Sequence, residues 1–95
     1  MSQFRLVFRV HVIQRMFQRR VSEEEVKQVV SVGETIETYP EDKPFASRLM
    51  LGWSGSRPIH VVVADNVTAQ EAIIITVYQP DAEEWEAGFK RRKCR

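Results

Sequence analysis

The hydrophobic positions that follow Val10 repeat with the period of an α-helix. At about 100° per residue, one side of such a helix carries four apolar side chains, with Val12 at its margin: Val10, Ile13, Met16 and Phe17. This spacing predicts a helix from Val10 to about residue 20, with its apolar side against the core. The preceding stretch at 4–8, FRLVF, fits either a short strand or an extended lead-in.

A second helix is predicted from the residues around Ser22. Ser22 and Glu25 have the spacing of a capping box, in which each side chain accepts a hydrogen bond from the other residue's backbone N–H. A run of valines at helical spacing follows, and Gly33 is the expected residue just beyond the helix C-terminus.

After Gly33 the apolar period changes to two, which is typical of strands. Four strands are predicted between turn-forming stretches, at residues 35–39, 47–53, 58–64 and 73–78. Asp81 and Glu84 have the spacing of a helix start, so a short C-terminal helix is predicted over 81–89. The expected fold is α+β, a single domain over 1–95. Two N-terminal helices pack on an antiparallel four-stranded sheet, and a basic tail occupies about 90–95.

Charge is distributed unevenly along the chain, although the net charge is only +1. Residues 1–20 contain five arginines and no acid, whereas residues 21–46 contain seven acids and two lysines. The basic N-terminal segment is suited to binding a phosphate-rich partner or an acidic protein. The alternative is that the basic first helix simply pairs with the acidic second one.

Composition narrows the class of protein further. Hydrophobic residues make up 43% and charged residues 28%, which fits a folded globular domain. No apolar run approaches the roughly 20 residues that cross a bilayer, so no membrane contact is expected. Because Cys94 is the only cysteine, it cannot form an internal disulfide, and a cytoplasmic location is predicted. The histidines and the cysteine lack metal-ligand spacing, so no metal and no cofactor are expected.

His11 and Arg15 form the first candidate site. They are four residues apart, so they project together from the polar side of the first predicted helix, with Arg19 continuing the row. An imidazole beside guanidinium groups can transfer a proton next to a bound phosphate, whose charge the arginines stabilise. Lys43, in the polar loop at 41–45, is either a further phosphate contact or a solvated side chain.

His60 forms the second candidate site. If the hairpins close symmetrically, His60 lies opposite Met50 and Thr76, with Arg48 and Tyr78 on the same face of the sheet. The alternative is a structural histidine that is hydrogen-bonded locally.

Several motifs run in order along nearly the whole chain: His11-x3-Arg15-x3-Arg19, VSEEEV at 21–26, GETIETYP at 33–40, KPF at 43–45, RPIHVVVA at 57–64 and TVYQPDAEEW at 76–85. As a set they resemble a small bacterial family of uncharacterised domains with the pattern HxxxRxxxR, GExIxxY, LHVV and TxYxPxxxxW. Two positions depart from that pattern: Arg20, where the family more often has glycine, and Ser47, where it often has cysteine.

The resemblance implies a toxin–antitoxin arrangement. Members of that family are commonly encoded beside a protein with a YgiT-type zinc finger, and their domain is similar to the RelE and BrnT group of α+β toxins, which cleave RNA without a metal. The family has no agreed catalytic set to transfer, so residue chemistry assigns the roles on the matching positions: His11, His60 and Tyr78 are candidates for catalysis, and Arg15, Arg19, Lys43 and Arg48 are candidates for substrate binding.

Two functions are therefore predicted from different classes. The first is a toxin that acts as a metal-independent endoribonuclease on messenger RNA, free or ribosome-bound, and is neutralised by an antitoxin protein. The second is a non-catalytic module that binds protein or nucleic acid, and a degenerate toxin that keeps only the scaffold is a third possibility. Convergence of His11, Arg15 and His60 on one open groove would favour the first, whereas positions on opposite sides of the sheet would favour the binding module.

Overall fold

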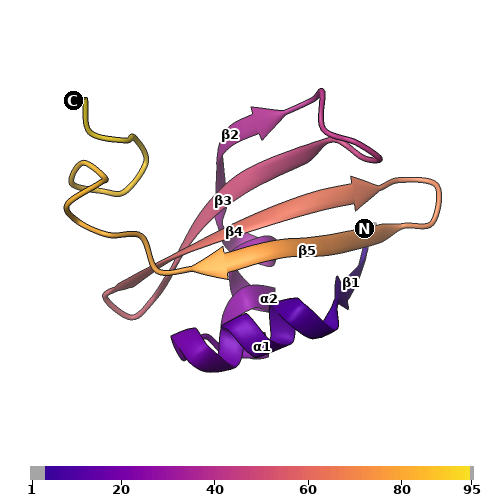
Figure 1. Ribbon diagram of the computed structural model, residues 1–95, viewed down its shortest axis with the longest axis horizontal. Coiled ribbons are helices and arrows are strands. Elements are labelled where there is room, and N and C mark those ends of the chain that lie inside the picture. Colours follow the sequence, from indigo (N-terminus) through magenta and orange to yellow (C-terminus); the bar gives the residue numbers. More distant parts are fainter. Residues whose placement is uncertain (1–3, 95) are drawn as a thin grey trace.

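The computed structural model describes residues 4–94, which form two helices and one mixed sheet (Figure 1). The elements in chain order are β1 (Arg5–Phe8), α1 (Val10–Arg19), α2 (Glu23–Val32), β2 (Glu34–Tyr39), β3 (Ser47–Ser54), β4 (Arg57–Asn66) and β5 (Glu71–Tyr78). The sheet has five strands in the order β1-β5-β4-β3-β2. The α+β class is correct, but the four-stranded antiparallel sheet and the C-terminal helix are both wrong.

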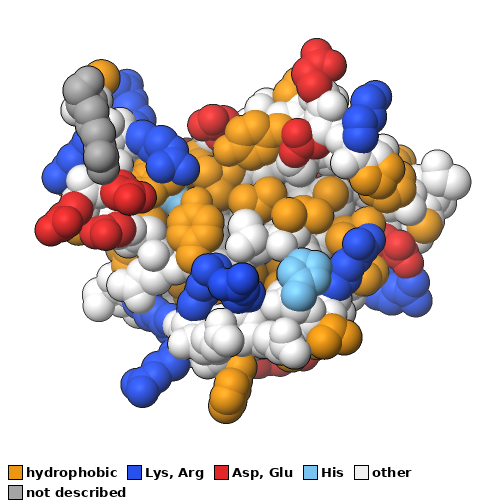
Figure 2. Space-filling model, viewed as in Figure 1, with side chains coloured by type: hydrophobic (Ala, Val, Ile, Leu, Met, Phe, Trp, Pro, Cys, Tyr) orange, Lys and Arg blue, Asp and Glu red, His pale blue; other side chains and the backbone are white. Residues whose placement is uncertain are grey.

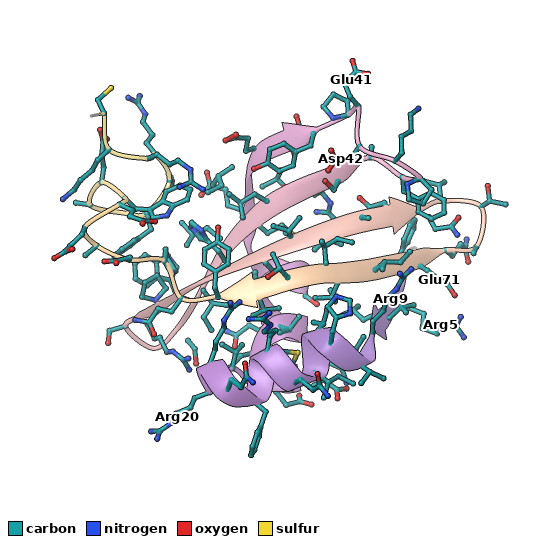
Figure 3. All side chains as sticks on the ribbon, in the orientation of Figure 1. Arg5, Arg9, Arg20, Glu41, Asp42 and Glu71 are labelled. Carbon is teal, nitrogen blue, oxygen red and sulfur yellow. The ribbon has the colours of Figure 1, made fainter. Side chains whose placement is uncertain are left out.

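The additional strand is β1, which pairs with β5 in parallel, from Arg5 opposite Glu71 to Phe8 opposite Ile74. Arg5 and Glu71 also form an ion pair, and their side chains point toward one another in Figure 3. A four-residue stretch with three apolar side chains is too short for its period to separate a strand from a lead-in. The partner strand β5 is also far away in the sequence, so only pairing with β5 makes this stretch a strand.

The predicted C-terminal helix over 81–89 is a series of turns instead. Gly88 and Phe89 both have positive φ, 91° and 61°, which reverses the chain so that Trp85 forms a bridge with Arg92. The side chain of Trp85 is buried. The Asp81 carboxylate does accept a hydrogen bond from the backbone N–H of Glu83, at 2.8 Å, but that bond closes a local turn. Burial of Trp85 on the sheet therefore overrides the helix-start signal.

The side of α1 that is buried is rotated relative to the apolar side that the sequence predicts. Val12 and Met16 are the buried residues of this helix, whereas Val10, Ile13 and Phe17 are exposed by 72%, 51% and 85%. The five side chains together cover a broad arc of the helix, and α1 contacts the sheet through β5, so only part of that arc is buried. The periodicity locates the arc but cannot say which part of it meets the sheet.

α2 begins as the sequence predicts. The Ser22 hydroxyl accepts a hydrogen bond from the Glu25 N–H at 3.1 Å, and the Glu25 carboxylate accepts one from the Ser22 N–H at 2.8 Å. Val26 and Val29 are buried against β3 and β4. Gly52 permits this close packing, because a Cβ there would lie 2.5 Å from the Val29 Cγ2 atom.

Arg20 ends α1 in the left-handed region, with φ 57° and ψ 43°, and its N–H caps the carbonyls of Met16 and Phe17. An L-residue with a side chain is strained there, whereas glycine is not. We expect Arg20→Gly to raise the free energy of unfolding by about 0.5–1 kcal/mol, measured by urea denaturation. Gln18→Gly, within the same helix, should lower it by about 1 kcal/mol. A loss of stability from both substitutions would contradict this cap.

The two helices cover one face of the sheet, and the residues that they bury form the main core. The opposite face, called the outer face below, has no helix over it among residues 4–94; the C-terminal segment 81–94 lies at one end of it (Figure 1). No helix in the described part of the chain is long and apolar enough to span a membrane.

Candidate nucleic-acid interface

A groove of about 290 Å³ lies between α1 and β5. It exists because β1 stops pairing at Ile74, so the last residues of β5 face α1 instead of another strand. Its lining residues are His11, Val12, Arg15, Arg19, Ile75 and Thr76. The structure thus brings three of the predicted site residues together: His11, Arg15 and Arg19.

Arg19 is held in place at one end of this groove. Its Nη1 atom donates a hydrogen bond to the Val77 carbonyl at 2.8 Å, which occupies one of the five N–H donors of the guanidinium. His11 and Arg15 are exposed beside it. α1 contains no acidic residue, so the positive charge of this row is not neutralised within its own helix.

The alternative that the basic helix pairs with the acidic one is not supported. Glu23 and Glu24 pair with Lys27 on their own helix, and Glu25 pairs with Arg57 of β4. Among residues 4–94 no ion pair joins α1 to α2. The row on α1 is therefore directed toward solvent and the sheet edge.

Arg57 positions the end of this row, a role that sequence reasoning missed. Its Nη atoms donate to the backbone carbonyls of Arg20 at 2.7 Å and Arg19 at 2.9 Å, and its Nε atom donates to the side chain of Gln79 at 2.9 Å. These bonds tie the last turn of α1 to β4 and to the end of β5. The only available signal was its place beside Pro58 in the RPIHVVVA motif.

His60 does not reach this groove. It lies on the outer face of β4 and is completely buried. Its Nε2 atom is 2.9 Å from the Phe89 carbonyl, and its Nδ1 atom is 3.2 Å from the Tyr78 hydroxyl. Because a carbonyl can only accept, Nε2–H donates to Phe89; in the neutral imidazole Nδ1 then accepts from the Tyr78 hydroxyl. The ring of Trp85 meets His60 edge to face at 4.5 Å between centroids.

Burial lowers the pKa of His60 below its ordinary value of about 6.5; the hydrogen bond to Phe89 opposes this shift, and nearby Arg92 adds to it. Between this lowered pKa and about pH 6.5, the unfolded chain therefore binds a proton that the folded protein does not.

We expect the free energy of unfolding to fall as pH drops from about 7 toward 5.5, by at most about 1.4 kcal/mol per pH unit. Urea denaturation of His11→Gln, in which His60 is the only histidine, measures this dependence. A flat profile would mean that His60 protonates as readily in the folded protein as in the unfolded chain.

The predicted neighbours of His60 were partly wrong. His60 is paired with Leu51 and Tyr78, not with Met50 and Thr76. The β3–β4 turn contains two residues, Gly55 and Ser56, and the strand register shifts on β5 between Thr76 and Ile74. Tyr78 accordingly lies on the face of His60, as predicted, because residues paired across strands share a face.

Arg48 and Lys43 lie elsewhere. Arg48 is on the helix-covered face, where its Nε atom is 2.9 Å from the Asp65 carboxylate and its Nη1 atom is 3.2 Å from the sulfur of Met50. Lys43 is exposed in the loop between β2 and β3. Three of the seven predicted site residues line the groove. Tyr78 directly follows Val77, the β5 residue whose carbonyl binds Arg19.

Comparison with known proteins identifies one family. A family model described as a domain of unknown function (DUF4258) matches residues 8–79, a span that includes the α1 row, His60 and Tyr78 but not segment 81–94. No curated protein and no solved structure matches the chain.

Proposed function

The chain belongs to the DUF4258 family, and from this premise we propose that it is a toxin-like, metal-independent endoribonuclease that acts on messenger RNA. One observation carries the proposal: the exposed row of His11, Arg15 and Arg19 lines a single groove on a helix without acids. Guanidinium groups bind phosphate oxygens through forked hydrogen bonds, and an accessible imidazole beside them can move a proton.

The chemistry follows from these groups alone. His11 removes the proton from a ribose 2′-hydroxyl, whose oxygen then attacks the adjacent phosphorus. Arg15 and Arg19 stabilise the negative charge that develops on the phosphoryl oxygens. The bond to the 5′-oxygen breaks, and that oxygen takes up a proton from the His11 imidazolium. The products are a 2′,3′-cyclic phosphate and a 5′-hydroxyl. Since His60 is buried, this scheme uses one imidazole for both proton transfers.

A protein partner also belongs to the proposal. Val10, Ile13 and Phe17 form an exposed apolar row along α1, and such i, i+3, i+7 rows are recognised by the grooves of partner proteins. An antitoxin, of the YgiT zinc-finger type that the resemblance implies, would neutralise the activity. Action on messenger RNA would take place in the cytoplasm.

The second candidate is a non-catalytic nucleic-acid-binding module, and one observation favours it. Two of the three predicted catalytic side chains, His60 and Tyr78, are hydrogen-bonded to each other, and His60 is inaccessible. On this alternative the α1 row binds RNA, but no turnover follows.

Arg15→Glu tests both candidates. We expect it to weaken RNA binding by about tenfold or more and to lower the salt dependence, because a phosphate contact is replaced by a like charge. Fluorescence anisotropy with labelled RNA measures the binding, and gel assays in EDTA, with and without ribosomes, measure cleavage.

Arg15→Gln and Gln14→Glu are matched variants, because each lowers the charge of α1 by one unit and of the two residues only Arg15 lines the groove. Gln14→Glu should weaken RNA binding clearly less than Arg15→Gln. Binding without cleavage under every condition would favour the non-catalytic module. Absence of RNA binding would exclude both candidates, whereas growth arrest on expression, relieved by the neighbouring gene, would support the toxin.

A further inference from the structure

The outer face of the sheet next to the groove is apolar and carries two tyrosines. Leu49, Val62, Tyr78 and Tyr39 share this face, because each is paired with, or two residues from, another residue on it. The rings of Tyr39 and Tyr78 are half-buried, so part of each remains accessible. Figure 2 shows apolar side chains gathered over the middle of this face.

The groove opens directly onto this face. Thr76 lines the groove and is also paired with Val62 on the outer face, so the groove and the outer face meet at the free edge of β5. Burial raises the pKa of both tyrosines, and Arg92 opposes this shift in each. The guanidinium of Arg92 itself lies over the ring of Trp85, with its Cζ atom 4.7 Å from the ring centroid, so a cation stands at the 81–94 end of the outer face.

The two borders of the face carry opposite charge. Basic side chains and a histidine lie along the α1 border, whereas the β2 border carries mostly acidic side chains with a basic one at its loop end (Figure 2). Arg9 extends the basic border, since it lies at the start of α1 beside β5, whereas Arg20 points away from the sheet at the other end (Figure 3). Glu37, which is exposed, lies on the outer face of β2 opposite Leu49. A polyanionic backbone is attracted to one border and repelled by the other.

We infer that the outer face is the base-binding part of a single-stranded RNA site, with the phosphates along the α1 row and the bases over Val62 and Tyr78. This inference rests on the proposed RNA-binding function and adds the substrate class and the orientation of the strand. Bases stack on aromatic rings and cover apolar surface, which duplex RNA does not offer because its bases are paired and stacked internally. The charge of the two borders favours placement of the backbone along α1.

A second copy of the chain fits this face less well. A two-fold axis along the strands would bring the segments 81–94 of the two copies together, and an axis across the strands would bring their two basic α1 borders together (Figure 1). A folded protein partner also finds a better apolar row on α1, where Phe17 is 85% exposed. Single-stranded RNA satisfies both the charged border and the half-buried side chains of Val62, Tyr39 and Tyr78.

The experiment compares two probes with the same phosphates. A short fluorescein-labelled 2′-O-methyl oligouridylate carries bases, whereas its abasic counterpart does not, and neither can be cleaved through a 2′-hydroxyl. We expect the full chain to bind the base-bearing strand about tenfold more tightly for each stacked base. Tyr78→Leu should remove most of this difference and Tyr78→Phe should retain it, because the ring is kept.

Tyr39→Ala provides a second variant that does not touch His60, with Thr38→Ala on the opposite face of the same strand as its control. Tyr39→Ala should reduce the preference for the base-bearing probe, and Thr38→Ala should not. Equal affinity for the two probes, or equal affinity for duplex and single-stranded RNA, would overturn the inference while leaving phosphate binding intact. Arg15→Glu should weaken both probes alike, and failure of the wild type to bind either would overturn the proposed function itself.

Discussion

Replacing His60 with alanine is expected to lower the free energy of unfolding by about 3–5 kcal/mol. The imidazole is completely buried, so its removal leaves a cavity between β4 and segment 81–94. It also leaves the Phe89 carbonyl and the Tyr78 hydroxyl without the partner they have now. Because domains of this size are stable by only about 5–15 kcal/mol, such a loss is a large part of the total.

Urea denaturation measures this loss, and His11→Ala is its matched control. His11 is exposed on α1, so the same substitution there should change the free energy of unfolding by no more than about 0.5 kcal/mol. Trp85 fluorescence reports whether segment 81–94 stays on the sheet, because the indole lies against the His60 ring. If His60→Ala and His11→Ala cost the same, segment 81–94 does not cover His60 in solution.

The parts of the fold that the sequence predicts are those fixed by neighbouring residues. The capping box of Ser22 and Glu25 needs only four residues, and both of its hydrogen bonds are present. The strands β3, β4 and β5 have strong apolar runs bounded by turn residues, and their predicted bounds differ from the observed ones by at most two residues. Local hydrogen bonding and alternation are sufficient in these segments.

The parts that could not be predicted depend on distant contacts. β1 is a strand because β5 offers it an edge, and residues 81–89 are not a helix because Trp85 is buried against His60. In α1 the periodicity predicts an amphipathic helix correctly, but the sheet covers Val12 and Met16 and leaves Phe17 exposed. Each error concerns which surface a segment meets, and the sequence of the segment does not contain that information.

The candidate site shows the same contrast between features set by neighbouring residues and features set by distant contacts. The row of His11, Arg15 and Arg19 follows from helical spacing within one element, and the structure brings these three together. The grouping around His60 required the register of two hairpins. A two-residue turn at 55–56 and the irregularity on β5 changed that register, so Arg48 lies on the other face of the sheet.

The burial of His60 leaves both proton transfers of the proposed chemistry to His11, which the sequence alone could not decide. With His60 buried, His11 is the only imidazole on the groove, so no second one can compensate for its loss. We expect His11→Ala to lower the rate of RNA cleavage by about 10²–10⁴-fold, which is the range for loss of a general acid–base. RNA binding should change by less than about threefold, because Arg15 and Arg19 still hold the phosphate.

A loss of cleavage rate in His11→Ala without a matching loss of RNA affinity would distinguish a catalytic role of His11 from a role in binding or positioning RNA. Single-turnover cleavage in EDTA measures the rate, and anisotropy with a 2′-O-methyl strand measures the affinity without turnover. Arg15→Ala should instead lower the RNA affinity markedly, because the Arg15 guanidinium binds the phosphate in both the ground state and the transition state. If His11→Ala cleaves RNA at the wild-type rate, another group moves the proton and His11 serves only as part of the binding surface. A loss of affinity in His11→Ala that matches its loss of rate would assign the imidazole to phosphate binding, since uniform binding does not accelerate the chemical step.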